Sequence, residues 1–257
     1  MLTFLRKIRK SLIESGSTRK YLLYAIGEVA LVVIGILIAL QINNWNEWRK
    51  ERIIEIELLK TIESDLKSTL SDVTNDFENH LKSQKSAIQF KRFLLGEEMS
   101  EDSIIFHFDA LMQDRHFFPK TIGYESLKSS DMTLVSDDSL RLIITELYEI
   151  TFPRIKEWDE SNTRWDIGML LNPYWKKHFM LSNQIAYRQH NSLGAPLYSF
   201  KLMSEEEIRQ DIDLQIDLQQ STQLRGRKIS LTKSGIDRIK TTLQAIHEGL
   251  ERMGAIN

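Results

Sequence analysis

Residues 21–43 form an apolar run, YLLYAIGEVALVVIGILIALQIN, that contains a single charged side chain, Glu28. As an α-helix, the roughly 21 mostly apolar residues of this run span about 32 Å, which matches a bilayer hydrocarbon core about 30 Å thick. Aromatic side chains of the kind that anchor membrane helices at the two interfaces mark both edges of the run: Tyr21, Tyr24, Trp45 and Trp48. The sequence therefore predicts a transmembrane helix over residues 21–44.

A buried core helix and a cleaved signal peptide also contain apolar runs. The apolar part of a signal peptide is about 7–15 residues long and ends in a small-x-small cleavage site. The run in this chain is longer and ends in Leu40-Gln41-Ile42-Asn43. The length, the flanks and the aromatic edges favour an uncleaved signal anchor.

The charges on either side of the run give the anchor a direction. Residues 1–20 hold six basic side chains and one acid, whereas the basic residues at 49–52 alternate with glutamates. Since the more cationic flank stays in the cytoplasm, we expect the N-terminus inside and the bulk of the chain exported. Within this basic segment, residues 2–14 are amphipathic, which is typical of a helix on the cytoplasmic leaflet. The alternative is that these charges only set the topology.

One face of the transmembrane helix differs from the rest. Gly35 follows Glu28 by seven residues and Ala39 by eleven, so at about 100° per residue the three share a face. A carboxylate inside the membrane costs about 2.5–3.5 kcal/mol, and small residues let helices approach closely. We expect this face to form an oligomer or partner interface. The alternative is a protonated Glu28 that hydrogen-bonds locally near the headgroups.

The exported part begins with a long segment without helix breakers. No Gly or Pro occurs between Ile36 and Leu95. Apolar residues recur at steps of three and four: Leu59, Ile62, Leu66, Leu70, Val73, Phe77 and Leu81. This spacing predicts that the membrane helix continues outward as an ascending stalk helix over residues 45–96.

The C-terminal part, residues 204–257, has the pattern of a second long helix. Ser204 and Glu207 form a capping box, and apolar positions then follow at alternating steps of three and four, as in a coiled-coil seam. Gly226 and Gly235 are expected to bend or break this helix. We predict an antiparallel return helix, although the two seams pair equally well between chains.

Residues 97–203, between the two long helices, are predicted to form a helical head. They hold all four prolines and fifteen of the 23 aromatic residues. Loops are expected at Asn172-Pro173 and at Gly194-Ala195-Pro196. Helices are expected near 101–114, 122–130, 137–151, 154–171 and 174–180. The predicted fold class is therefore all-α: a transmembrane helix, a long helical stalk, a helical head and a long antiparallel return helix.

Composition excludes several classes of site and function. The chain of 257 residues has no cysteine, so disulfides, thiolate metal sites and Cys nucleophiles are excluded. Four prolines and eleven glycines are too few turn residues for a β-sandwich or barrel. The net charge of −2 provides no basic field for nucleic acid.

No catalytic motif occurs in the chain, so we predict no enzyme, no catalytic residue, no cofactor and no metal site. The histidines lack the spacing of a metal-binding pair, and the densest group of metal-ligand types is His107, Asp109, Asp114 and His116. Asp137-Asp138 is interpreted as a helix start. Five aromatic residues of the head have two interpretations. The main one is that they belong to a plain core, and the minor one is that they line a ligand pocket: Trp158, Trp165, Tyr174, Trp175 and Phe179.

Four stretches carry a resemblance to a known family: Lys20–Glu28, Val33–Glu47, Tyr124–Ser130 and Leu134–Asp137. They resemble a single-span bacterial membrane-protein family of the Bacteroidetes, which is known only as a domain of unknown function. The resemblance implies a single-span protein and implies no activity, substrate or catalytic residue.

These observations predict a membrane-anchored extracytoplasmic helical scaffold, interaction or sensor module that forms oligomers. We expect it in the bacterial inner membrane, with the N-terminus cytoplasmic and the bulk of the chain periplasmic. Its expected partners are the lipid bilayer and either a second copy or another membrane protein. One alternative is an accessory subunit of an ion- or proton-coupled complex that uses Glu28. The other is an exported enzyme with its site in the aromatic-rich head.

Overall fold

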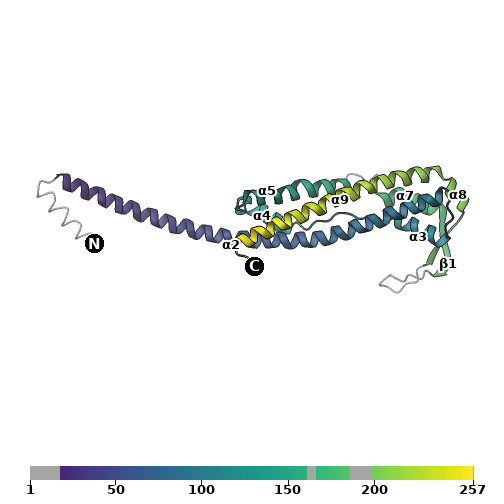
Figure 1. The fold of residues 1–257 in the computed structure, drawn as a ribbon, viewed down its shortest axis with the longest axis horizontal. Coiled ribbons are helices and arrows are strands. Elements are labelled where there is room, and N and C mark those ends of the chain that lie inside the picture. The colour runs from purple at the N-terminus through teal and green to yellow at the C-terminus, as the bar shows by residue number, and fades with distance from the viewer. Residues whose placement is uncertain (1–17, 161–165, 186–197, 257) are drawn as a thin grey trace. The chain divides into compact units, whose positions relative to one another are not determined.

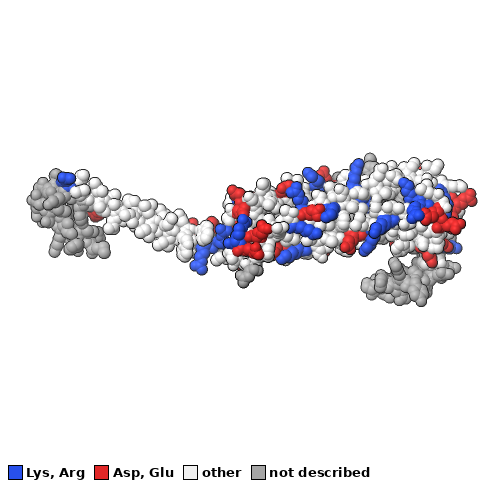
Figure 2. Space-filling model, viewed as in Figure 1, with Lys and Arg blue, Asp and Glu red and all other residues white. Residues whose placement is uncertain are grey.

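The computed structural model describes residues 18–160, 166–185 and 198–256 and divides the chain into two compact units, Met1–Glu55 and Ile56–Asn257. Helix α2 (Thr18–Leu94) belongs to both units, and its outer part is unbroken, as the absence of Gly and Pro between Ile36 and Leu95 predicts. From Val29 to Ile42 its large apolar side chains are each at least 46% exposed. This part of α2 is long and apolar enough to span a membrane. Figure 2 shows charged side chains over the second unit and few along this stretch.

The second unit is almost entirely helical (Figure 1). The outer part of α2 is followed by short helices, a two-stranded sheet and a long final helix. In chain order these elements are α3 (Glu101–Met112), α4 (Ile122–Ser130), η1 (Met132–Leu134), α5 (Asp138–Glu146), η2 (Leu147–Thr151), α6 (Phe152–Glu160), α7 (Ile167–His178), β1 (Phe179–Ile185), β2 (Tyr198–Leu202), α8 (Glu205–Gln210) and α9 (Ile212–Arg252).

Helix α9 runs back antiparallel to the outer part of α2 (Figure 1). Lys91 Nζ donates to Gln219 Oε1 at 2.8 Å near one end of the pair, and Lys60 Nζ donates to the Ala255 carbonyl at 3.2 Å near the other. Between them the apolar seams of both helices lie in one core with fully buried residues, among them Leu59, Ile62, Leu66, Ile239, Ile246 and Leu250. The structure thus confirms the antiparallel return helix and pairs the seams within one chain.

A second core closes the other end of the hairpin and is rich in aromatic residues. Phe90 and Phe93 of α2 pack with Phe108 of α3, which also stacks on Trp175 at 5.6 Å between ring centroids. Phe179 lies 4.8 Å from Trp175. Most of the aromatic residues expected in the head therefore lie in this core or line a groove beside α4.

The structure corrects three loop and helix assignments in the head. The helix expected at 154–171 is interrupted at Asp166, which has extended backbone and caps α7. Pro173 lies inside α7, not in a loop, because the stripe Ile167, Leu171, Tyr174 and His178 is buried along that helix. The helix expected at 174–180 is the end of α7 and stops at His178, since Phe179–Ile185 forms β1 and pairs antiparallel with β2, with Phe179 opposite Leu202. This pairing joins distant segments, so local spacing does not reveal it. Gly194-Ala195-Pro196 lies outside the described residues.

The return helix starts as predicted but is divided near its beginning. The Ser204 side chain accepts from Glu207 N at 3.2 Å, which confirms the N-terminal cap. The chain then breaks at Asp211, between α8 and α9. Gly226 and Gly235 do not break α9, because both lie within a continuous helix to Arg252. Asp137 caps α5 by accepting from Ser139 N and Leu140 N, as expected.

Candidate functional site

A groove of about 830 Å³ lies between α4, the η2–α6 segment and residues 117–121. Its floor is aromatic: the rings of Tyr124 and Tyr148 stack with centroids 4.4 Å apart and an interplanar angle of 4°. Phe152 packs edge-on against Tyr148 at 5.0 Å, and Phe117 packs against Phe152 at 5.2 Å. These four rings are buried, so the floor is held in place by ring-to-ring packing.

At the edge of this floor, the Glu149 carboxylate pairs with Lys128 and also accepts a hydrogen bond from Tyr124. Tyr124 Oη and Lys128 Nζ both donate to Glu149 Oε1, at 2.9 and 2.8 Å. Burial and the neighbouring Glu149 raise the pKa of Tyr124 to about 12, so its hydroxyl stays protonated. The hydrogen bonds from Lys128 and Tyr124 lower the pKa of Glu149, which keeps the carboxylate charged. The arrangement joins α4 to η2 and presents one anionic and one cationic group at the rim.

Tyr148 differs from Tyr124 because its buried hydroxyl makes no hydrogen bond within the described part of the chain. Burial raises the pKa of Tyr148 above its ordinary value, and the charge of Asp65 adds to this effect. Tyr148 lies in η2, which is π-helical, and such segments within helices occur frequently at functional sites. The Tyr148 hydroxyl is thus a protonated phenol whose donor no described residue uses, and it is buried rather than open to the groove. No spacing or motif in the sequence predicts this groove.

Helix α4 is held against α2 by a close backbone approach. Gly123 N donates to Asp65 Oδ2 at 2.7 Å. A Cβ atom at Gly123 would lie 2.7 Å from Ile62 N and 2.9 Å from Ile62 Cγ1, closer than real contacts allow. Because the backbone of α2 cannot move aside locally, only glycine fits at this position. The same contact places Tyr124, the next residue, under the groove.

We expect Gly123→Ala to lower the free energy of unfolding by about 2–3 kcal/mol, because the added methyl group overpacks a rigid contact. Urea unfolding of the full chain in detergent micelles, followed by circular dichroism, measures the change. Gly226→Ala is the control, since a Cβ there meets no atom within 4 Å. It should be neutral or stabilising by up to about 1 kcal/mol, because Gly is a poor helix former. Equal effects of the two variants would contradict the close approach.

The residues of the predicted membrane face lie in the first unit. Glu28, Gly35 and Ala39 are exposed on α2, and a Cβ at Gly35 would meet nothing within 4 Å. Packing within the chain therefore does not require glycine there, and the interface stays a prediction. The anchor residues Trp45 and Trp48 are 61% and 54% exposed. Tyr21 and Tyr24 lie in helical backbone, but their side chains lie outside the described residues.

The minor interpretation of the head aromatics as one pocket is wrong, because they lie in different environments. Trp175 and Phe179 stack in the core, and Tyr174 Oη donates to Asp217 Oδ2 at 2.6 Å. Trp158 lies beneath the Arg227 guanidinium, 5.6 Å from its carbon. Trp165 lies outside the described residues.

The histidine and aspartate residues between 107 and 116 also contact different partners. His107 Nδ1 lies 3.3 Å from Ser86 Oγ, whereas Lys228 Nζ donates to Asp114 Oδ2 at 2.8 Å. In the ranges that the structure describes, no three His, Asp or Glu side chains come together as a possible metal site.

A family model described as a family of unknown function, DUF6090, matches residues 28–163. The chain belongs to this family. The matched region contains every residue that lines the groove, from Phe117 to Glu157. The groove is thus built within the DUF6090 region. No curated protein and no solved structure matches the chain.

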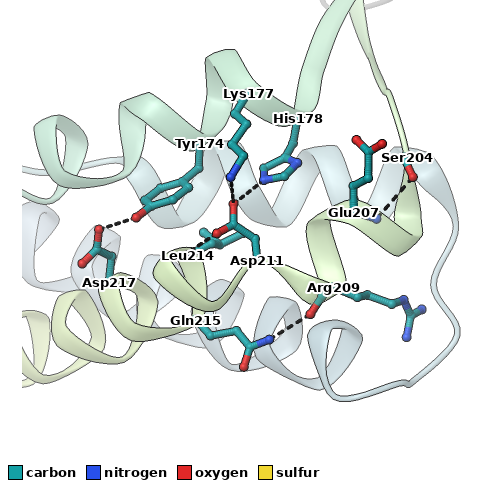
Figure 3. Close-up of polar contacts among 10 residues, drawn as sticks. All are labelled: Tyr174, Lys177, His178, Ser204, Glu207, Arg209, Asp211, Leu214, Gln215 and Asp217. Carbon is teal, nitrogen blue, oxygen red and sulfur yellow. Dashed lines mark hydrogen bonds and ion pairs between the residues drawn. The ribbon is translucent and has the colours of Figure 1, made fainter.

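Beyond the DUF6090 region, a buried polar joint connects α7 to α8 and α9 (Figure 3). His178 Nε2 lies 2.6 Å from Asp211 Oδ2, and Lys177 Nζ donates to the same oxygen at 3.0 Å. Asp211 Oδ1 accepts from Leu214 N at 3.1 Å and so caps α9. Burial raises the pKa of Asp211, but the hydrogen bonds from His178, Lys177 and Leu214 outweigh burial and hold it below its usual value.

The joint is structural rather than catalytic in its geometry. His178 and Asp211 are 2% and 7% exposed, so neither reaches a groove or the solvent. The one sequence signal for this joint is Asp211 itself, because an aspartate directly before an apolar helical repeat is an N-cap signal. What the sequence does not show is that α7 brings a histidine to the same carboxylate.

Proposed function

We propose that this DUF6090 chain is a membrane-anchored helical scaffold or interaction module whose second unit lies outside the cytoplasm. The observation that carries the proposal is the apolar stretch of α2. Its large side chains from Val29 to Ile42 are each at least 46% exposed, although the second unit has two well-buried cores of its own. An uncovered apolar helix of this length is stable in a bilayer and costly in water.

The direction of insertion rests on charge. The segment before the apolar stretch, residues 1–20, has six basic side chains and one acid, whereas the basic residues after the stretch alternate with glutamates. The larger positive charge before the stretch favours a cytoplasmic N-terminus. A bacterial inner membrane with the second unit in the periplasm fits this direction. In the groove, Tyr124 and Lys128 both donate to Glu149, which joins two helical segments as a structural ion pair does, and this supports an interaction role.

The test combines carbonate extraction of membranes with protease treatment of intact spheroplasts. We expect the full chain to stay in the membrane pellet and the protease to degrade the part after residue 44. Leu37→Lys should weaken insertion, because a central lysine costs about 2.5–3.5 kcal/mol. Leu142→Lys is the control, since Leu142 is a 67% exposed apolar residue of α5 in the second unit. A chain that is extracted by carbonate or protected from protease contradicts the proposal.

A second candidate function, ligand binding, is favoured by the groove of about 830 Å³ with its aromatic lining. Native mass spectrometry of the full chain purified from its own membranes should reveal a bound mass. Phe118 lines the groove and is 72% exposed, so Phe118→Ala should release that mass without unfolding the protein. Phe106→Ala is the control, because Phe106 is 51% exposed and lies outside the groove. Equal retention of the bound mass in both variants contradicts binding in this groove.

A further inference from the structure

The segment of α2 directly after its apolar stretch carries exposed aromatic and basic side chains. Trp45 and Trp48 are 61% and 54% exposed, and Arg49 and Lys50 are exposed as well. The apolar stretch ends at Ile42, so Arg49 follows it after about 10 Å of helix. In a membrane-anchored chain this segment lies at the surface of the bilayer.

The two tryptophans share a helical face with arginine and not with the neighbouring acids. At about 100° per residue, Trp48 and Arg49 lie within about 60° of Trp45 around the helix. Glu47 and Glu51, the acids on either side of Arg49 in the sequence, lie about 160° and 120° away from the Trp45 direction. Charges that alternate along the sequence are therefore separated in space, and the tryptophan face is cationic.

A second guanidinium on this face is held in place by its neighbours. The guanidinium carbon of Arg52 lies 5.5 Å from the centroid of the Trp48 ring. Arg52 Nη1 donates to Glu55 Oε2 at 2.6 Å, so Glu55 neutralises this cation. Arg49 is exposed and lies about one turn nearer the apolar stretch, which makes it the cation of this face closest to a membrane surface.

The direction of the helix brings the Arg49 side chain back toward the membrane. In an α-helix, side chains lean toward the N-terminus and cover the turn before their own Cα. Because α2 leaves the apolar stretch in the N-to-C direction, the long side chain of Arg49 reaches back toward Trp45. The headgroup layer of one leaflet is roughly 5–8 Å thick, so the guanidinium reaches it. Phosphate is the anion of that layer, and a guanidinium binds two phosphate oxygens at once.

We propose that Arg49, with Trp45 and Trp48 beside it, binds the phosphate of an anionic phospholipid in the leaflet where α2 leaves the bilayer. The inference rests on the proposed membrane anchoring, since without a bilayer this face meets no headgroup. The two rings lie at the level where aromatic belts are found, and the guanidinium adds a choice among lipids by charge. Because only one face of the segment binds, the contact sets the depth of α2 and its rotation about its own axis.

Lipid preference in vesicles tests the proposal with the full chain. The chain is reconstituted into phosphatidylcholine vesicles that contain a minor fraction of phosphatidylglycerol, with bromine on the acyl chains of one lipid or the other. Bromine quenches nearby tryptophan fluorescence, so the two quenching curves at equal mole fraction give the enrichment of each lipid around the helix. We expect a roughly fivefold preference for phosphatidylglycerol, the strength of one basic residue at an anionic membrane surface. Arg49→Gln should remove this preference.

Lys50→Gln is the matched control, because it removes the same charge from the adjacent residue, about 140° around the helix from Trp45. It should keep most of the preference. Arg49→Lys keeps the charge but lacks the planar fork, so it should keep only part. All three variants should have an unchanged circular dichroism spectrum, because both side chains are exposed. Equal losses in Arg49→Gln and Lys50→Gln, or no preference in the natural chain, overturn the proposal.

Two further measurements separate the lipid site from a free-anion site and from the anchor. Inorganic phosphate, compared with chloride at the same ionic strength, should leave the lipid preference unchanged. If phosphate removes the preference, the site binds a free anion and the proposal is overturned. A chain that does not float with the vesicles contradicts the membrane anchor, and the lipid site then fails with it. A chain that floats but shows no preference overturns the lipid site alone.

Discussion

Replacing Arg225 with methionine should lower the free energy of unfolding by roughly 3–5 kcal/mol, as expected when one partner of a buried polar set is removed. Arg225 is 1% exposed in the middle of α9. Its Nη1 donates to the Gln113 carbonyl at 2.8 Å, and its Nη2 donates to the Leu111 carbonyl at 2.6 Å. Those carbonyls end α3, where a cation is favourable for the helix dipole.

Arg225 also stays charged in this buried position. Burial lowers its pKa to about 10, and the nearby Asp114 opposes that change, so the guanidinium is protonated at neutral pH. Methionine fills a similar volume but leaves the two carbonyls without the Arg225 donors and removes one of the positive charges near Asp114, which keeps its bond from Lys228. Lysine keeps the charge but lacks the fork, so Arg225→Lys should recover only part of the lost stability.

The matched control for this variant is Arg227→Met, two residues away on the same helix. Arg227 is exposed and lies over the Trp158 ring at 5.6 Å, a contact worth about 0.5–1 kcal/mol at an exposed site. Urea unfolding of both full-length variants in micelles, followed by tryptophan fluorescence, measures the difference. Similar losses for Arg225→Met and Arg227→Met would show that the bonds to α3 contribute little.

Much of the fold is predictable from the sequence because its long helices repeat a local signal. The absence of Gly and Pro after Ile36 predicts α2, and the three- and four-residue steps correctly predict buried residues from Leu59 to Val73. The series is wrong at Leu81, which is 36% exposed. The helix expected at 122–130 has those bounds in the structure. Local signals mislead at Pro173, where burial of α7 on the core outweighs the missing N–H, and at Phe179, where pairing with a distant strand decides the structure.

The candidate groove is not predictable in the same way, because its parts come from three segments that no spacing connects. The resemblance marks Tyr124–Ser130 but gives no partner for Tyr124. Only the packing of Gly123 on Ile62 and the stacking of Tyr124 on Tyr148 bring the segments together. The apolar anchor is the opposite case. Its signal is composition and length, so the sequence alone predicts it.

Asp211→Asn should lower the free energy of unfolding by about 3 kcal/mol at neutral pH, since hydrogen bonds to a buried charge are worth about 1.5–3 kcal/mol each. The carboxylate side chain is 3% exposed and meets His178 at 2.6 Å. Lys177 contributes less, because its side chain is 59% exposed and water screens the pair. Asp211→Ala should cost about 1 kcal/mol more than Asp211→Asn, because alanine also removes the cap of α9.

The pH dependence of this variant distinguishes a charged joint from a merely well-packed one. The folded-state pKa of Asp211 lies below its ordinary value of 3.8. The stabilisation is therefore fully present above that value and is lost as the pH falls through the lower folded-state pKa. The difference in the free energy of unfolding between the natural chain and Asp211→Asn should stay constant from neutral pH down to mildly acidic pH and shrink only in strong acid.

Asp237→Asn, which removes an exposed pair with Lys233, is the control and should change the free energy of unfolding by less than about 1 kcal/mol at any pH. A difference for Asp211→Asn that disappears already at mildly acidic pH would show that the carboxylate is not stabilised in its charged form, and the joint would then hold α7 to α9 by shape alone.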